Sequence, residues 1–277
     1  MSAPVRLGAV DYLNVRPLVH GLDARTDLMS LRFDAPSECA RLLDAGEIDL
    51  GMVPSITYLN RPGDQIVPGV CIGSDGPVDS VALFLRRPLR DVKTLAVDTS
   101  SRTSVALTRI LCARRFGISP DFVPHAPDLA AMLSWADGAL VIGDPALFAD
   151  HRALGAEKID LGLAWSEMTG LPFVWAFWAG RPDAAAPEVV NALQGAARSG
   201  IANLDEIADA YSADAARRAI SRRYLRASIR FQLDVRALEG LRAYYREALA
   251  LGVAAGDPSL SFFVDFAEPV QERRMGA

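Results

Sequence analysis

The feature of this sequence that most constrains its fold is an internal repeat. The tripeptide Ala-Val-Asp ends an apolar segment at 9–11 and again at 96–98, an offset of 87 residues. Apolar segments that open with an aspartate begin at Asp49 and at Asp137, an offset of 88 residues. Turns and helix-forming segments follow in the same order both times. The repeat predicts two βαβαβ units, each a parallel sheet with helices on its faces.

The pattern of apolar residues gives approximate positions for these elements. Strands are expected at 5–10, 28–33, 49–53, 94–97, 122–123 and 137–142. Pro17 suits the first turn of a helix that runs to Leu22, and Asp128 can cap a helix through Trp135. Beyond Gly180 the sequence favours four helices, at 187–199, 204–211, 213–225 and 235–250. We expect these helices to pack on the first unit.

Two further apolar segments, 78–86 and 171–179, connect the two units and predict a hinge of two extended strands. The expected fold class is therefore α/β, with two lobes and a ligand cleft between them, as in two-lobed solute-binding proteins. We expect a discontinuous lobe 1 of residues 1–84 plus 178–277, and an inserted lobe 2 of residues 85–177. Composition agrees, because 277 residues with 51% hydrophobic side chains can form two domains of medium size.

Ligands bind parallel sheets outside the carboxyl ends of the strands. Here those ends carry the loops Asp11–Asn14, Pro54–Ile56, Asp98–Ser104 and Gly143–Pro145. The third of these loops is rich in hydroxyl groups and opens a predicted helix, where free backbone N–H groups and the helix dipole favour an anion. We interpret it as a carboxylate-binding loop; a well-capped helix with a Ser/Thr-rich start is the alternative.

Charge and cysteine content exclude several classes of protein. The formal net charge is −5, which argues against a nucleic-acid surface. The apolar run 173–179 is too short to span a bilayer, and the N-terminus lacks the pattern of a secretory signal. The three cysteines and three histidines have no metal-ligand spacing, so no metal site is expected. The sequence predicts a cytoplasmic protein with reduced thiols and neither a nucleic-acid nor a membrane partner.

Several long motifs carry a resemblance to a known family. They are DYLNVRPL (11–18), EIDLGMVPS (47–55), IVPGVCIGSDGPVDSVALF (66–84), VDTSSRTS (97–104), VIGDPAL (141–147), DLGLAW (160–165) and TGLPFVWAFW (169–178). Over Val5–Trp178 the chain closely resembles the chorismate dehydratase family of the futalosine route to menaquinone, called MqnA. The resemblance implies a type 2 periplasmic-binding-protein-like fold. It also implies a lyase that converts chorismate to 3-[(1-carboxyvinyl)oxy]benzoate and water without a cofactor.

Chorismate carries two carboxylates, so two anion sites are expected. One is the hydroxyl-rich turn, in which Arg102 either pairs with the substrate or faces solvent. The other combines Ser80 with Pro54-Ser55, although Ser55 can instead cap the next helix. The substrate-binding residues expected in all are Tyr12, Pro54, Ser55, Ser80, Ser100, Ser101, Arg102, Thr103, Ser104, Gly143, Asp144 and Thr169.

Asn14 is the predicted catalytic residue, because the family motif includes it and an amide can hold the leaving hydroxyl or stabilise developing charge. Alternatively, Asn14 satisfies only its own turn. Asp11 and Asp98 can act merely as caps, whereas Asp144 is the carboxylate best placed for the cleft. Because no well-placed titratable side chain is evident, we hypothesise that the enolpyruvyl carboxylate of the substrate itself removes the C3 proton.

Two other functions are compatible with such a fold. A binding protein would only hold a small anionic carboxylate metabolite, and fold alone does not separate it from an enzyme. The related 1,4-dihydroxy-6-naphthoate synthase would need a histidine in the cleft, and none of the motif loops contains one. The sequence makes no prediction of the oligomeric state.

Overall fold

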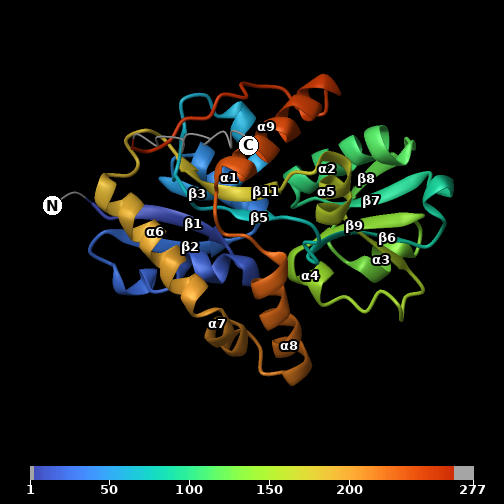
Figure 1. Ribbon diagram of the computed structural model, residues 1–277, viewed down its shortest axis with the longest axis horizontal. Coiled ribbons are helices and arrows are strands. Elements are labelled where there is room, and N and C mark those ends of the chain that lie inside the picture. The colour runs from blue at the N-terminus through green and yellow to red at the C-terminus, as the bar shows by residue number, and fades with distance from the viewer. Residues whose placement is uncertain (1–2, 265–277) are drawn as a thin grey trace, which may run out of the picture.

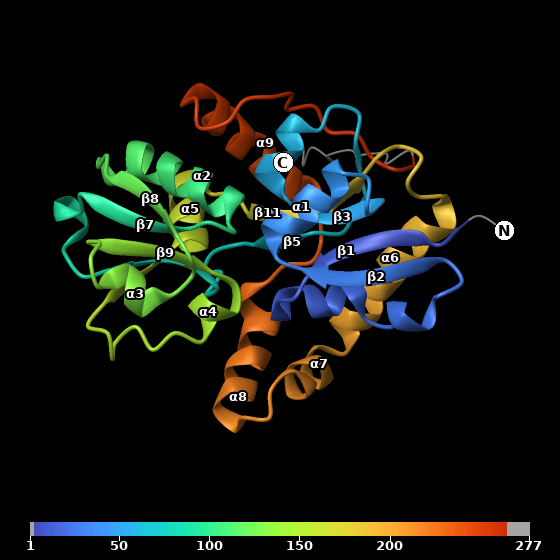
Figure 2. The ribbon, with the colours of Figure 1, turned by 180° about the vertical axis from the view of Figure 1, so that it is seen from behind.

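The two predicted lobes are seen in the computed structural model as two β-sheets that lie side by side, each with helices on its faces (Figure 1). The structure describes residues 3–264, apart from the side chain of Ser37. Figure 2 shows the same arrangement from behind; the C-terminal helices lie beside the first sheet and extend toward the second. The cavity described below lies where the two lobes meet.

The first sheet has the strand order β2-β1-β3-β11-β4, with β5 also paired to β11. Strand β1 runs parallel to β2 and β3, whereas β11 is antiparallel to β3. The bounds are Val5–Val10 for β1, Met29–Asp34 for β2, Leu50–Pro54 for β3, Gln65–Ile66 for β4, Ile72–Ser74 for β5 and Phe173–Gly180 for β11.

The second sheet has the strand order β10-β6-β9-β7-β8. Strand β7 runs parallel to β8 and β9, and β6 is antiparallel to β9. The bounds are Val81–Leu85 for β6, Thr94–Asp98 for β7, Asp121–His125 for β8, Gly138–Ile142 for β9 and Glu157–Asp160 for β10. Both sheets therefore contain three parallel strands followed by one antiparallel strand, β2-β1-β3-β11 and β8-β7-β9-β6, which confirms the internal repeat.

The antiparallel fourth strand, β11 in the first sheet and β6 in the second, comes from a segment that was expected to be a hinge. Both expected lobe boundaries, 84/85 and 177/178, fall inside strands, because β6 belongs wholly to the second sheet and β11 wholly to the first. We propose that the chain passes between lobes at 75–80 and again at 170–172. Residues 265–277 of the expected lobe 1 lie outside the described part of the chain.

Helices cover both sheets. They are α1 (Pro36–Asp44), α2 (Arg102–Leu111), α3 (Leu129–Leu133), α4 (Gly143–Leu147), α5 (Leu161–Thr169), α6 (Pro187–Ala202), α7 (Leu204–Tyr211), α8 (Ala215–Arg223) and α9 (Val235–Ala250). The helix expected from Pro17 to Leu22 is instead the 3₁₀ helix η1 (Leu13–Val19). Pro17 lies inside it and offers no N–H for an α-helical hydrogen bond, which disfavours a regular α-helix here. Another 3₁₀ helix, η3 (Ser55–Asn60), follows β3.

The C-terminal helices were expected to pack on the first lobe, but they do not all pack on that lobe alone. Helix α6 packs on η1, but α9 contacts both β11 of the first lobe and α2 of the second. On α9 the Tyr244 hydroxyl donates a hydrogen bond to the Thr103 carbonyl oxygen (2.9 Å), and the Tyr245 hydroxyl donates one to the Ser55 carbonyl oxygen (2.6 Å). One helix thus holds the strand ends of both lobes.

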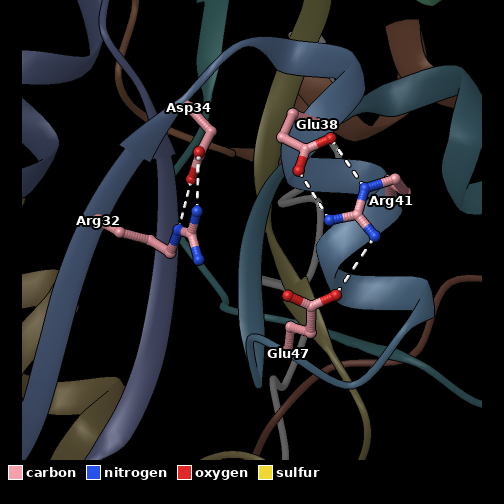
Figure 3. A network of polar contacts seen from close by, with 5 residues as sticks. All are labelled: Arg32, Asp34, Glu38, Arg41 and Glu47. Atoms are coloured by element: carbon pink, nitrogen blue, oxygen red, sulfur yellow. Dashed lines mark hydrogen bonds and ion pairs between the residues drawn. The ribbon is translucent and has the colours of Figure 1, made fainter.

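The surface of the first lobe carries paired charges. Arg32 and Asp34 pair on β2, and on α1 Arg41 pairs with Glu38 and also reaches Glu47 (Figure 3). Exposed ion pairs of this kind contribute only about 0–1 kcal/mol each, so the apolar core must supply most of the stability. Across residues 3–264, none of the helices has the length and apolar character needed to cross a membrane.

Candidate active site

A cavity of about 90 Å³ lies between the lobes, at the carboxyl ends of strands from both sheets. The first lobe contributes the ends of β1 and β3 with part of β11, and the second contributes the turn after β7 and the end of β9. Its described lining consists of Val10, Asn14, Val15, Pro36, Met52, Pro54, Ile72, Val78, Ser80, Val81, Ser100, Ser101, Arg102, Thr103, Ser104, Ile142, Gly143, Trp175 and Ala176.

Asn14 lies on η1 and faces the cavity from the first lobe. Its side chain lies close to the Tyr224 hydroxyl: burial raises the pKa of that phenol, and Asn14 opposes part of the rise. An effect in this direction is that of a donor, so the NH₂ group is the part of the amide that faces Tyr224. The Asn14 Oδ1 atom is buried and has no partner in the described part of the chain. Asn14 therefore holds an unused acceptor next to the cavity.

Ser80 lies beside this amide. Its hydroxyl is 2.7 Å from the Tyr224 hydroxyl, and both side chains are buried. Tyr224 thus joins Ser80 to Asn14 and fixes both side chains from behind. The contact holds the Asn14 amide and the Ser80 hydroxyl at one position in the cavity wall.

The hydroxyl-rich turn after β7 forms the opposite wall. Ser101 is the N-cap residue of α2 but makes no side-chain cap, so the first N–H groups of the helix are not satisfied by it. The Ser100 hydroxyl donates to Asp98 Oδ1 (2.6 Å), and Thr103 Oγ1 accepts a hydrogen bond from the backbone N–H of Ile56 (3.3 Å). The turn therefore offers an anion its backbone N–H groups and the hydroxyls of Ser101 and Ser104, which also line the cavity, with Arg102 as its cation.

Gly143 closes the cavity at the end of β9. Its φ of +65° lies in the left-handed region, and a Cβ atom there would come within 2.7–2.9 Å of the Tyr12 ring. Only glycine meets both requirements without strain. Tyr12 is not part of the cavity lining; it packs on Gly143 across the lobe interface.

Three other predicted site residues lie outside the lining. Ser55 is buried and donates its hydroxyl hydrogen bond to the Val174 carbonyl oxygen (2.8 Å), so it neither caps η3 nor faces the cavity. Thr169 is at the end of α5 and donates to the Trp165 carbonyl oxygen (2.9 Å), within its own helix. The third is Asp144, which was expected to face the cleft.

Asp144 instead holds the two lobes together. Its carboxylate accepts hydrogen bonds from the backbone N–H of Leu13 (3.3 Å) and from the Tyr211 hydroxyl, both of which belong to the first lobe. Burial raises the pKa of this carboxyl group, and the two hydrogen bonds partly oppose the rise. Since Leu13 directly precedes Asn14, Asp144 fastens the turn that carries the predicted catalytic amide.

Three residues at this site were not among those predicted. Tyr224 comes from the segment after α8, and no local signal links it to Ser80. Trp175 lines the cavity from β11, a segment expected to be a hinge, while its Nε1 donates to Ser74 (3.1 Å). Asp98 was interpreted as a possible turn cap, yet it is 1% exposed and its Oδ2 has no partner in the described residues.

A larger groove of about 640 Å³ adjoins the cavity and shares Ser101 and Arg102 with it. Both lobes line this groove, and Asp98 forms part of its wall. In the described lining of the cavity itself, Arg102 is the only charged side chain. Across residues 3–264 there is no group of three or more His, Cys, Asp or Glu side chains placed to hold a metal ion.

The amino-acid sequence of this chain is similar to those of known proteins. The model of a family described as menaquinone biosynthesis matches residues 5–250. A chorismate dehydratase from Thermus thermophilus is 33% identical over 268 residues, which cover 91% of this chain and 97% of the relative.

Solved structures share the fold at much lower identity. A protein from Archaeoglobus fulgidus superposes with a TM-score of 0.73 at 18% identity, over 91% of this chain and 99% of that one. The alkanesulfonate-binding protein SsuA from Xanthomonas axonopodis pv. citri, bound to MOPS, gives a TM-score of 0.57 at 18% identity, over 90% and 94% of the two chains. These likenesses confirm the periplasmic-binding-protein-like α/β fold. By its sequence relatives, the chain belongs to the menaquinone biosynthesis family that the MqnA motifs predicted.

Proposed function

We propose that this protein dehydrates chorismate to 3-[(1-carboxyvinyl)oxy]benzoate in menaquinone biosynthesis. The observation that carries the proposal is the near full-length match to a chorismate dehydratase, together with a cavity whose opposite walls suit that substrate. One wall holds the N-terminus of α2 and Arg102, which favour a carboxylate, and the other holds the Asn14 amide. The substrate is thus a small dianion held between the lobes.

The turn of the second lobe is the better supported anion site. Arg102 and the first N–H groups of α2 meet at the cavity there, whereas the Ser100 hydroxyl is already engaged with Asp98. The second carboxylate is left to the wall formed by Ser80 and Pro54, without Ser55. This arrangement fixes the substrate at both ends, which is the main requirement for a reaction that aromatisation already favours.

Asn14 is the proposed catalytic residue. Its free Oδ1 can accept a hydrogen bond from the C4 hydroxyl of the substrate and so hold the leaving group in place. The Tyr224 hydroxyl fixes the amide, which lowers the entropy lost when the substrate binds. An amide does not titrate, so Asn14 positions groups but does not carry the proton.

The C3 proton is removed, in this proposal, by the enolpyruvyl carboxylate of the substrate itself. Among the described residues that line the cavity there is no Asp, Glu, His or Lys, and Asp144 is held elsewhere by Leu13 and Tyr211. The lack of a histidine in this lining also disfavours naphthoate synthase chemistry. Taking the C3 proton leaves a carbanion whose charge spreads into the ring carboxylate.

We further propose that the protein works in the cytoplasm with its thiols reduced. Cys39, Cys71 and Cys112 are all free and buried, and burial raises the pKa of each thiol. A buried protonated thiol is unreactive, so these cysteines take no part in the reaction. Fractionation of cells that produce the native protein, with immunodetection, tests this location.

The test of the function is direct conversion. Purified protein is mixed with chorismate, with no cofactor added, and the product is followed by mass spectrometry and by ultraviolet absorbance. Loss of one water with a new benzoate chromophore supports the proposal. Intact chorismate in the presence of folded protein contradicts it, and binding measured by thermal shift would then favour a binding protein for anionic metabolites. Asn191→Ala, an exposed substitution on α6, serves as the matched active control.

A further inference from the structure

Asp98 stands between the active-site cavity and the adjoining groove. Its Oδ1 accepts a hydrogen bond from the Ser100 hydroxyl (2.6 Å) and another from the Ser100 backbone N–H (2.8 Å). Ser100 lines the cavity, whereas Asp98 lines the groove. The two side chains therefore form a hydrogen-bonded path from a buried carboxyl group to the place where the substrate binds.

A turn cap alone does not explain this carboxylate. Capping uses only Oδ1, and Asn or Ser would cap the turn equally well. The second oxygen, Oδ2, is buried and has no hydrogen-bond partner among the described residues, although a buried ionised carboxylate normally needs several. Burial raises the pKa of Asp98 above its ordinary value, while the contacts with Ser100 and with the backbone of Ile142 oppose the rise. Asp98 is thus easier to protonate than an exposed aspartate.

The proposed reaction needs such an acid. When the C4–O bond of chorismate breaks, the departing oxygen carries the electron pair and must gain a proton to leave as water. Arg102, the only charged side chain in the described lining of the cavity, is a very weak acid and does not supply it. Asn14 does not titrate either. Ser100 is therefore the lining hydroxyl with a carboxyl group directly behind it.

We propose that Asp98 delivers the proton that the leaving hydroxyl needs, through the Ser100 hydroxyl. In the reacting complex the proton of Asp98 lies on Oδ1, the oxygen next to the Ser100 hydroxyl, and that hydroxyl turns from Asp98 toward the substrate. As the C4–O bond breaks, the Ser100 hydroxyl gives its proton to the departing oxygen and takes the proton of Asp98 in the same step. The electron pair of the C3–H bond becomes the new ring double bond, and the C3 proton stays on the enolpyruvyl carboxyl group. Water, the aromatic product and ionised Asp98 result.

The cycle closes after the product leaves. Ionised Asp98, which is buried, regains a proton through Ser100 from water that enters the emptied cavity, while the product carboxyl group loses one to solvent. Protons are then balanced over one turnover, and no other reagent is needed. This inference rests on the proposed dehydration, and it adds a positioning and proton-supplying residue that acts only through Ser100.

The test compares Asp98→Asn, Ser100→Ala and the double variant with the wild-type protein on chorismate. Asparagine keeps an acceptor for the Ser100 N–H but holds no transferable proton. We expect kcat to fall about 100-fold in each single variant, the usual contribution of a general acid, with KM changed by less than about threefold. The double variant should be no slower than either single one, because both changes break one path. Asp128→Asn, which caps α3 on the surface, is the matched control.

The pH profile separates proton supply from a structural role. Tyr12 faces Asp98, and the groove that Asp98 lines also carries the charged side chains of Asp44, Arg61, Arg102 and Arg109. Wild-type kcat should fall at high pH as Asp98 loses its proton, whereas the residual rate of Asp98→Asn should lack that fall. A solvent deuterium isotope effect on kcat should likewise shrink in the variant.

Two results would overturn the inference. One is an Asp98→Asn variant with kcat within threefold of the wild type and an unchanged pH profile. The other is a double variant whose loss equals the product of the single losses. Failure of the proposed function is recognised separately, because the wild-type protein would then leave chorismate intact.

Discussion

Asp98 and Asp144 lie near the carboxyl ends of two neighbouring parallel strands of the second sheet and serve different ends. Asp98 is the last residue of β7, whereas Asp144 lies two residues beyond β9, in α4, and burial raises the pKa of each carboxyl group. Asp98 is bound by its own turn and keeps one oxygen without a partner in the described chain. Asp144 accepts its hydrogen bonds from Leu13 and Tyr211 of the other lobe.

The difference shows that position at a strand end does not by itself decide what a carboxylate does. A carboxylate whose partners come from another lobe holds the lobes together. A carboxylate whose partners are local, with one oxygen to spare beside a cavity, is available for proton transfer. If the two roles are distinct, substitutions that act through Asp144 should mainly change KM, whereas those that act through Asp98 should mainly change kcat.

Asn14→Ala should give the largest loss of activity. Asp144 binds the backbone of Leu13, next to Asn14, so a substitution of Asp144 that acts by displacing Asn14 should cost no more than removing the Asn14 side chain. The variant removes the free Oδ1 and the donor to Tyr224. We expect kcat to fall about 100- to 1,000-fold, as when one preorganised polar group is removed from an active site. Steady-state kinetics measure the loss, and circular dichroism checks the fold. A variant with at least a tenth of wild-type kcat would remove Asn14 from the catalytic role.

Asp144→Ala should weaken the closed arrangement without removing chemistry. It deletes the hydrogen bonds to Leu13 and Tyr211, of which each is worth about 1–3 kcal/mol when the acceptor is charged. We expect kcat/KM for chorismate to fall about 10-fold, mainly through KM, since less protein is in the binding-competent arrangement.

Tyr211→Phe removes one of these donors and should give a smaller loss in the same direction. Combined with Asp144→Ala it should add little, since both substitutions break the same contact. A 100-fold loss of kcat in Asp144→Ala with KM unchanged would erase the distinction between the two aspartates.

The stability of Asp98→Asn should depend on pH in one direction. The folded-state pKa of Asp98 lies above the unfolded value of about 3.9, so the folded state holds its proton longer as pH rises. The free energy of unfolding of the wild type therefore falls as pH rises from the unfolded-state pKa to the folded-state pKa. At any pH above both pKa values the whole of this loss remains. Relative to the wild type, the urea midpoint of Asp98→Asn should rise between pH 4 and pH 7. A relative decrease would mean that the ionised carboxylate stabilises the fold.

Thr169→Val should have the smallest effect. The Thr169 hydroxyl bonds within α5 and to the backbone of Leu171, and it does not line the cavity. We expect kcat and KM to stay within about twofold of the wild type, as is common for substitutions away from the site. A large rise in KM would return Thr169 to the binding site that the sequence predicted.

Much of the fold followed from local pattern. The strand expected at 5–10 and the helices expected at 204–211 and 235–250 have the predicted bounds. The loops at strand ends also led to Asn14 and to the Ser100–Ser104 turn, because a parallel sheet collects those ends at one edge. These features depend on periodicity and topology, both of which a sequence records.

What the sequence could not supply depends on partners distant along the chain. Asp144 meets Tyr211 67 residues away and Leu13 131 residues away, and Ser80 meets Tyr224 across 144 residues. Likewise, the apolar segments that contain β6 and β11 do not reveal which sheet each completes. Local residues specify that a segment is extended or polar, whereas its partners are fixed only by folding.

The adjacent tyrosines of α9 have a consequence for how ligands are exchanged. The Tyr244 hydroxyl donates a hydrogen bond to Thr103 on one wall of the site, and the Tyr245 hydroxyl donates one to Ser55 beside the other wall. One helix thus connects both walls. Swinging the lobes apart would break at least one of these buried bonds, at about 1 kcal/mol each. An arrangement with the lobes apart is then about fivefold less populated for each hydrogen bond lost. The time for which the product stays bound therefore depends in part on the contacts of α9, a helix that does not line the cavity.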